Sequence, residues 1–120
     1  MHLVTGGAYQ GKLAFAREKY ALEEKEISAC TSEGEPDWSC RCIDHWERYI
    51  LYCVKNDLPT EDKLRPDAIV ICDDIFCGVV PMEPLQRRWR EAAGRSLQQL
   101  ACRAESVERV FCGIGKVLKE

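Results

Sequence analysis

A glycine-rich loop between a short apolar segment and a run of helix-forming residues is the feature that most constrains this sequence. Residues 2–5 predict a buried strand, and residues 12 to about 24 predict a helix. The residues that join them follow the pattern glycine, four residues, glycine, lysine: Gly6, Gly7, Ala8, Tyr9, Gln10, Gly11 and Lys12. The chain is therefore expected to begin with a strand, a glycine loop and a helix.

This loop pattern predicts a phosphate-binding site. Glycines let the backbone wrap around phosphate groups, the N–H groups at the start of the helix favour an anion, and Lys12 can reach the terminal phosphates. We therefore predict nucleotide-binding residues from Gly6 to Leu13, with ATP or GTP as the ligand and a catalytic role for Lys12. The alternative is a plain tight turn.

The residue after the lysine departs from the pattern. A serine or threonine normally follows and binds Mg²⁺ through its hydroxyl group, but this chain has Leu13. Phosphate binding does not need that hydroxyl. Catalysis would need Mg²⁺ to be held another way, or would be slow.

The rest of the chain alternates between strand-like and helix-like segments. The sequence predicts strands at 26–31, 68–72 and 107–112, helices at 43–56 and 83–105, a loop at 32–39 and a glycine- and lysine-containing tail. Strands alternating with helices predict an α/β fold, in which a parallel sheet has helices on both faces and forms three layers. At 120 residues, the chain is expected to form a single domain over residues 1–120.

Composition and charge exclude several classes. With 46% hydrophobic and 31% charged residues, the chain is not a disordered or fibrous protein. A net charge of −3 argues against nonspecific nucleic-acid binding, which depends on a basic surface. No membrane segment or secretory signal is evident, so a cytoplasmic location is expected. The eight cysteines are widely spread and favour reduced, mostly buried thiols over a disulfide framework.

Two adjacent acids end the predicted strand at 68–72. A carboxylate at the end of a buried strand can face nucleotide-bound Mg²⁺ or an attacking hydroxyl group, so we predict Asp73 and Asp74 as metal ligands and Asp74 as a catalytic residue. The alternative is a solvated strand end.

Two further groups carry weaker hypotheses. Arg87, Arg88 and Arg90 could bind a substrate phosphate, although a solvated helix face is the preferred interpretation. Four residues of the types that zinc prefers lie in one part of the chain, but their spacing is irregular and unreactive thiols are the default: Cys30, Cys40, Cys42 and His45.

Two stretches resemble a known family of the P-loop superfamily, the adenosylcobinamide kinase/adenosylcobinamide-phosphate guanylyltransferases of cobalamin biosynthesis. The first stretch is LVTGGAYQGK, residues 3–12, and the second is residues 69–119. Within the second, DDIFCGVVPMEPLQRRWREAAGRSLQQLACRAESVERVF resembles the family's acidic segment, Gly-Val-Pro segment, arginine-rich helix and final strand.

The resemblance implies a P-loop NTPase fold of the RecA-like type, here reduced in size, and a trimeric assembly. It implies phosphorylation of a hydroxyl group of adenosylcobinamide, followed by transfer of GMP through a guanylylated histidine. Asp74 takes the place of an acidic residue, usually glutamate, and Gly78 and Pro81 would shape the adjacent loop.

The chain departs from this family in its histidines. Members are longer, and the part without a counterpart lies between the predicted second strand and the tryptophan-containing helix, where the guanylylated histidine is normally found. Only His2 and His45 are present, and neither matches that position. Three hypotheses result: a kinase that uses Lys12 and Asp74, a relative that binds nucleotide without turnover as a regulatory or assembly subunit, and a metal-binding structural protein.

Overall fold

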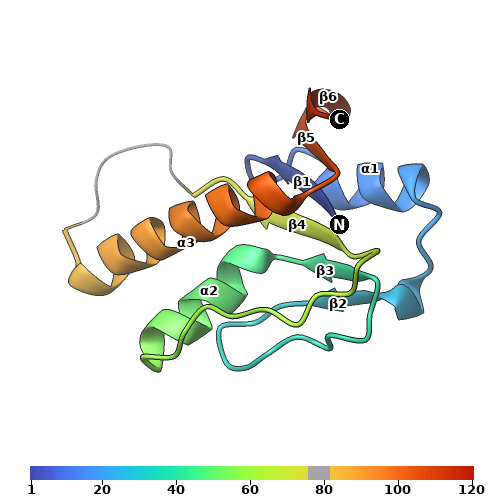
Figure 1. Cartoon of the computed structure of the whole chain (residues 1–120). Helices are drawn as coiled ribbons and strands as arrows, with labels where there is room; N and C mark the ends of the chain where they lie inside the picture. Colours follow the sequence, from blue (N-terminus) through green and yellow to red (C-terminus); the bar gives the residue numbers. More distant parts are fainter. Residues whose placement is uncertain (76–81) are drawn as a thin grey trace.

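The computed structural model describes residues 1–75 and 82–120, and these residues contain a six-stranded sheet (Figure 1). The strand order is β2-β3-β4-β1-β5-β6. The first five strands pair in parallel, and β6 is antiparallel to β5. The strands are β1 (His2–Gly6), β2 (Ile27–Ala29), β3 (Cys42–Asp44), β4 (Ile69–Asp73), β5 (Ser106–Phe111) and β6 (Ile114–Lys119). The predicted α/β class is confirmed, with one antiparallel strand that was not expected.

Helices cover both faces of the sheet, as predicted. Alternate strand residues point to opposite faces, so Leu3 and Val70 pack with α2 and α3, whereas Val4 and Ile71 pack with α1. Parallel strands buried on both sides account for the continuous apolar run in β4. The helices are α1 (Lys12–Lys19), α2 (Trp46–Lys55) and α3 (Pro84–Arg103).

The prediction of a helix at 43–56 was wrong at its start. Cys42–Asp44 forms β3, which is fully buried and pairs with both β2 and β4. His45 then takes a left-handed conformation, with φ 56°, and α2 begins at Trp46. Three residues are too few to show the alternating pattern of a strand, and Ile43 happens to continue the apolar spacing of the helix.

Two other boundaries differ from the prediction. The first helix ends at Lys19 rather than near residue 24, because Ala21 has a positive φ of 51° and a short 3₁₀ turn, Glu24–Glu26, follows. The tail forms β6, which is joined to β5 through Cys112 and Gly113 with φ values of 51° and 77°. Two consecutive positive φ values suit a tight hairpin turn.

Tryptophan side chains fix α2 against α3. The Trp46 indole N–H donates to Ser96 Oγ at 2.8 Å, and the Trp89 indole N–H donates to the Glu47 carbonyl oxygen at 2.7 Å. Trp46 is buried, as the apolar spacing of α2 predicts. The first turn of α2 is therefore held at the edge of the sheet where β3 and β4 end.

Over residues 1–75 and 82–120, no helix has the length and apolar character needed to cross a membrane.

Candidate functional site

The glycine loop turns between β1 and α1 with a geometry that needs glycine. Gly6 has φ 148°, and a Cβ atom there would lie 2.5 Å from the carbonyl oxygen of Val110. Gly11 has φ 86°. Gln10 anchors the loop to the β5–β6 turn, because its carbonyl oxygen accepts from the Gly113 N–H and its side-chain oxygen accepts from the Cys112 N–H, both at 2.8 Å. The loop is thus tied to the turn that follows β5, the strand next to β1.

Lys12 is buried at the first position of α1 and points back over the loop. Its Nζ donates to the carbonyl oxygen of Gly7 at 2.6 Å and lies 2.6 Å from Oδ1 of Asp73. A buried ammonium needs such partners, because burial without them would cost several kcal/mol. The lysine therefore lies between the loop and the end of β4.

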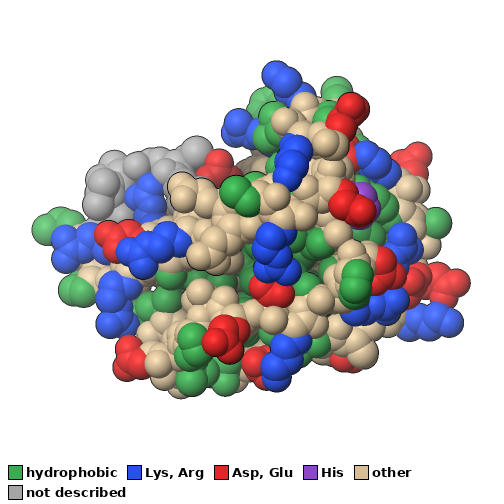
Figure 2. All heavy atoms as spheres, in the orientation of Figure 1, with side chains coloured by type: hydrophobic (Ala, Val, Ile, Leu, Met, Phe, Trp, Pro, Cys, Tyr) green, Lys and Arg blue, Asp and Glu red, His purple; other side chains and the backbone are tan. Residues whose placement is uncertain are grey.

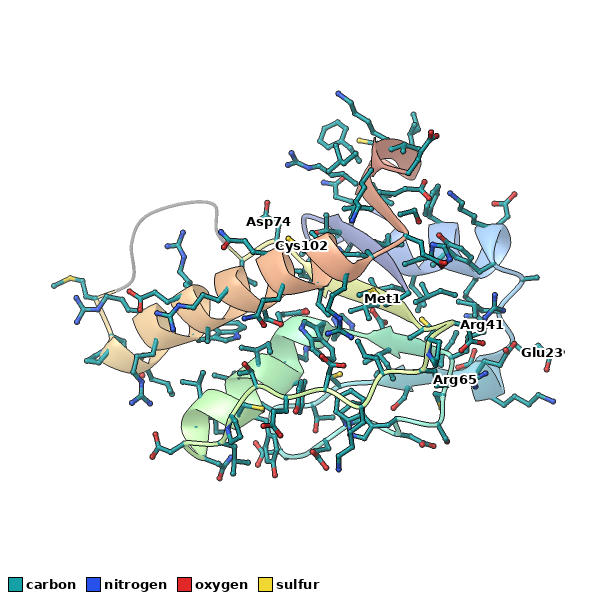
Figure 3. All side chains as sticks on the ribbon, in the orientation of Figure 1. Met1, Glu23, Arg41, Arg65, Asp74 and Cys102 are labelled. Carbon is teal, nitrogen blue, oxygen red and sulfur yellow. The ribbon has the colours of Figure 1, made fainter. Side chains whose placement is uncertain are left out.

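Sheet register places the two predicted acids beside the loop. Gly6 pairs with Asp73 at the last step of the β1–β4 ladder, and the Asp74 N–H donates to the Gly6 carbonyl oxygen at 2.7 Å. Asp74 lies where the chain leaves β4 (Figure 3). Of the two acids, Asp73 is the one whose carboxylate contacts Lys12.

A pocket of about 230 Å³ opens at this edge of the sheet. Four of the predicted nucleotide-binding residues line it, Ala8, Tyr9, Gly11 and Lys12, and its remaining lining comes from β3, β4 and α2: Asp44, His45, Arg48, Ile71 and Asp73. The other predicted residues Gly6, Gly7, Gln10 and Leu13 are not part of the lining, and Leu13 packs against the apolar cluster beneath α1.

The β3–α2 junction contributes Asp44 and Glu47, which the sequence did not predict, next to His45, which was considered only as part of a cysteine and histidine set. The buried Asp44 ends β3, and its Oδ1 accepts from the His45 N–H at 2.8 Å. Asp44 Oδ2 also lies 3.7 Å from His45 Nε2. The available signal was an acid after an apolar segment, the same signal that marks Asp73, but β3 was not recognised as a strand.

Glu47 is a buried acid in the first turn of α2. Its Oε1 lies 3.2 Å from His45 Nδ1, and its Oε2 accepts from the Asp73 N–H at 3.3 Å. Burial, together with the nearby charge of Asp73, raises the pKa of the Glu47 carboxyl group. Among the described residues, His45, Glu47 and Asp73 form a group whose ligand atoms all lie within 4.8 Å of one another.

The predicted cysteine and histidine set is not brought together. Cys30 packs in the core beneath α2 and α3, whereas Cys42 lies on the opposite face of the sheet and Cys40 contacts the Lys25 carbonyl oxygen near the surface. Burial raises the pKa of Cys30 and of Cys42 to about 12. The cysteines of the described residues are free thiols, and Cys77 lies outside the described residues, as do Phe76, Gly78 and Pro81.

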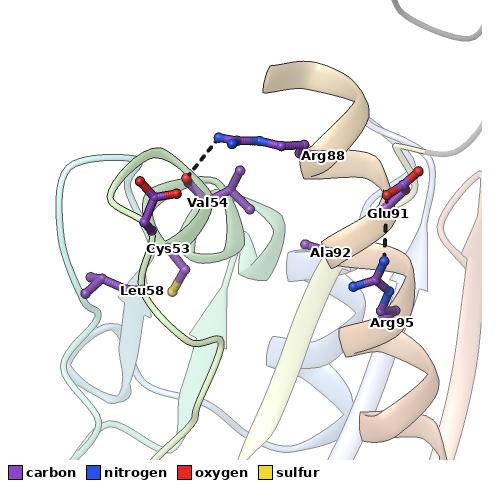
Figure 4. A pocket seen from close by; sticks show the side chains of 8 residues that line it. Cys53, Val54, Leu58, Arg88, Glu91, Ala92 and Arg95 are labelled. Carbon is purple, nitrogen blue, oxygen red and sulfur yellow. Dashed lines mark hydrogen bonds and ion pairs between the residues drawn. The ribbon is translucent and has the colours of Figure 1, made fainter. Parts of the chain in front are cut away.

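A second pocket, of about 360 Å³, lies between the C-terminal part of α2 and the first half of α3 (Figure 4). Arg88 donates to the Val54 carbonyl oxygen at 3.4 Å, and Arg95 pairs with Glu91 at 3.7 Å. Lys and Arg side chains gather over this end of α3 in Figure 2. The exposure of Arg87 and Arg88 is consistent with a solvated helix face, and this pocket lies at the opposite end of α2 from the glycine loop.

Comparison with protein families identifies the chain. Residues 41–118 match the model of the family described as cobinamide kinase / cobinamide phosphate guanyltransferase. The chain belongs to this family. The family acts in cobalamin biosynthesis as a kinase and transferase that uses nucleoside triphosphates. No curated protein matches the chain at a significant level.

The match to the cobinamide kinase family covers β3 to β6, including the pocket residues Asp44, His45 and Asp73, and confirms the resemblance of the second stretch. The glycine loop lies before the matched residues. Its assignment to nucleotide binding therefore depends on its own pattern and geometry.

Proposed function

We propose that this chain binds ATP or GTP at the glycine loop and transfers the terminal phosphoryl group to a hydroxyl group of cobinamide. The observation that carries the proposal is the position of the Lys12 ammonium, which lines the pocket and is buried between the Gly7 carbonyl oxygen and the Asp73 carboxylate. Ligands of open parallel sheets bind beyond the carboxyl ends of the strands, where this pocket opens.

Electrostatics supports phosphate at this position. The loop leads into the N-terminus of α1, where unpaired N–H groups favour an anion, and Lys12 adds a full positive charge. Phosphate oxygens would take the place of the Gly7 carbonyl oxygen and the Asp73 carboxylate as partners of the ammonium group. Lys12 would then neutralise charge on the transferring group.

Asp74 is the proposed base for the substrate hydroxyl group. In the transfer, the hydroxyl oxygen forms a bond to the terminal phosphorus, the bond from that phosphorus to the nucleoside diphosphate oxygen breaks, and the hydroxyl proton passes to a carboxylate. The hydrogen bond from the Asp74 N–H to the Gly6 carbonyl oxygen supports this role, because it keeps Asp74 beside the loop.

Mg²⁺ fits the donor set only in part. The carboxylates of Asp73 and Asp74 are ligands of the type that Mg²⁺ prefers, but Leu13 has no hydroxyl group and Asp73 Oδ1 already contacts Lys12. Bound Mg²⁺ would neutralise phosphate charge. The residues of the chain would still have to position the nucleotide and accept the proton.

Leu13 favours a second candidate function, in which the chain binds nucleotide without turnover as a regulatory or assembly subunit. Its side chain is partly buried against the apolar cluster beneath α1 and offers no hydroxyl group. Trimer formation, implied by the family resemblance, remains part of the proposal for both functions. The cysteine-based structural role is not favoured, because Cys30 and Cys42 lie on opposite faces of the sheet.

The deciding experiment is calorimetric titration of the full chain with ATP and GTP, with and without Mg²⁺. Lys12→Ala should weaken binding at least tenfold, whereas the control Lys25→Ala, at an exposed residue of the 3₁₀ turn, should not change it. Equal binding by Lys12→Ala, or no binding by the unaltered chain, would overturn the proposal. Release of nucleoside diphosphate on addition of adenosylcobinamide would separate the kinase from the binder without turnover.

A further inference from the structure

A histidine and an acid at the start of α2 meet an acid at the end of β4 beside the glycine-loop pocket. His45 precedes α2, Glu47 lies in its first turn, and Asp73 ends β4. Their ligand atoms lie within 4.8 Å of one another. We propose that His45, Glu47 and Asp73 bind a divalent transition-metal ion such as Mn²⁺ or Co²⁺.

The spacing fits a shared ion. Nitrogen and oxygen ligands lie about 2.0–2.2 Å from such metals, so neighbouring ligand atoms around one ion are roughly 3–4 Å apart. His45 Nδ1 and Glu47 Oε1 are already 3.2 Å apart. A carboxylate oxygen of Asp73 lies within 4.8 Å of both other ligand atoms, so small rotations of side chains would bring it into the same shell. A carboxylate has two oxygens, so Asp73 can contact Lys12 through Oδ1 and offer the other oxygen to the ion.

The charge of this region favours a cation. The side chains of Glu47 and Asp44 are only 4% and 8% exposed, and Asp73 faces the same pocket. Among residues 1–75 and 82–120, the basic side chains found near these acids are Lys12, which contacts Asp73 Oδ1, and the exposed Arg48, which lines the pocket. Within this described part of the chain Lys12 pairs with Asp73 and with neither Asp44 nor Glu47, so a divalent ion would compensate charge that Lys12 does not.

Neighbouring groups orient the ligands. Asp44 Oδ2 lies 3.7 Å from His45 Nε2, and the other ring nitrogen, Nδ1, is directed toward Glu47. This arrangement resembles the carboxylate–histidine–metal arrangement of many metal sites. The indole N–H of Trp89 donates to the Glu47 carbonyl oxygen and fixes the first turn of α2. One imidazole among carboxylates favours Mn²⁺, Co²⁺ or Zn²⁺ over Mg²⁺, which prefers oxygen ligands alone.

The metal site shares Asp73 with the proposed nucleotide site, but none of its three ligands belongs to the glycine loop. The two proposals can therefore fail separately. Lys12→Ala removes the cation that contacts Asp73, so the variant should lose nucleotide binding and retain or increase its affinity for the metal ion.

The test is titration of the metal-free full chain with Mn²⁺ by calorimetry and with Co²⁺ by visible absorption, without nucleotide. One ion should bind per chain, with a rise in melting temperature and at least tenfold weaker binding of Mg²⁺. His45→Asn should weaken Mn²⁺ binding at least tenfold; asparagine tolerates the positive φ of this position, 56°. The matched control is His2→Asn, whose ring nitrogen contacts Ser106 rather than the pocket.

Circular dichroism would confirm that each variant folds. If His45→Asn does not fold, Glu47→Gln provides a second test of the metal site. Absence of Mn²⁺ and Co²⁺ binding by the unaltered chain would overturn the proposal. Equal binding by the unaltered chain and by a folded His45→Asn or Glu47→Gln variant would overturn it as well.

Discussion

Lys12 and Asp73 are joined where two neighbouring parallel strands end, with Nζ 2.6 Å from Oδ1. The lysine follows the loop after β1, and the acid is the last residue of β4. Both side chains are held mostly away from water, with exposed fractions of 6% and 22%. The Lys12–Asp73 ion pair therefore has two expected roles: it stabilises the fold, and it positions the lysine of the candidate site.

Asp73→Asn should destabilise the chain by about 1–3 kcal/mol, because among the described residues it leaves the buried Lys12 ammonium with the Gly7 carbonyl oxygen as its remaining partner. Urea unfolding would measure the change. The control Asp67→Asn removes an exposed ion pair with Arg65 and should cost much less, because water screens the pair. Equal costs for the two variants would contradict a buried Lys12–Asp73 pair.

Gly6→Ala should destabilise the chain by about 1–3 kcal/mol or more, because the backbone has φ 148° and the new Cβ would meet the Val110 carbonyl oxygen at 2.5 Å. The variant should also bind nucleotide more weakly, since the loop must shift. Gly34→Ala is the control: its Cβ would have no atom within 4 Å, so its effect should stay within about 0.5 kcal/mol. Thermal unfolding of both variants would show whether the backbone conformation at position 6 requires glycine.

Glu47→Gln should raise the melting temperature of the metal-free chain at neutral pH. The pKa of Glu47 is raised in the folded state from its ordinary value of 4.5, so folded Glu47 holds its proton more tightly than unfolded Glu47 does. Its contribution to stability is therefore lost as the pH rises from 4.5 through the folded pKa. The increase in melting temperature caused by Glu47→Gln should become smaller toward pH 4.5. An increase that does not depend on pH would contradict a raised pKa of Glu47 as its cause.

Alkylation with iodoacetamide should distinguish exposed from buried thiols. Cys102 and Cys112 are exposed and should react in the native chain. Cys30 and Cys42 are buried, and burial raises the pKa of each to about 12, so both should react only after unfolding. Peptide mass spectrometry with and without denaturant would measure this difference. Reaction of Cys30 in the native chain at the rate of Cys102 would contradict the packing of the core.

Local patterns in the sequence determined much of the fold and half of the candidate site. The glycine loop, the apolar run of β4 and the apolar spacing of α3 each lie within one element, so periodicity and turn chemistry reveal them. The acids that follow β4 were predicted as site residues for the same reason. Family resemblance over the second half of the chain agreed with the family match at residues 41–118.

Tertiary structure decided what local patterns could not. β3 has three residues and is a strand because β2 and β4 pair with it, and β6 forms only because β5 offers an edge. Successive side chains of a strand point to opposite faces, so the register of β1 against β4 selects Asp73 rather than Asp74 as the partner of Lys12. The packing of α2 against β4 brings His45 and Glu47 next to Asp73. These residues are far from Asp73 in the sequence, and only the folded sheet brings them together.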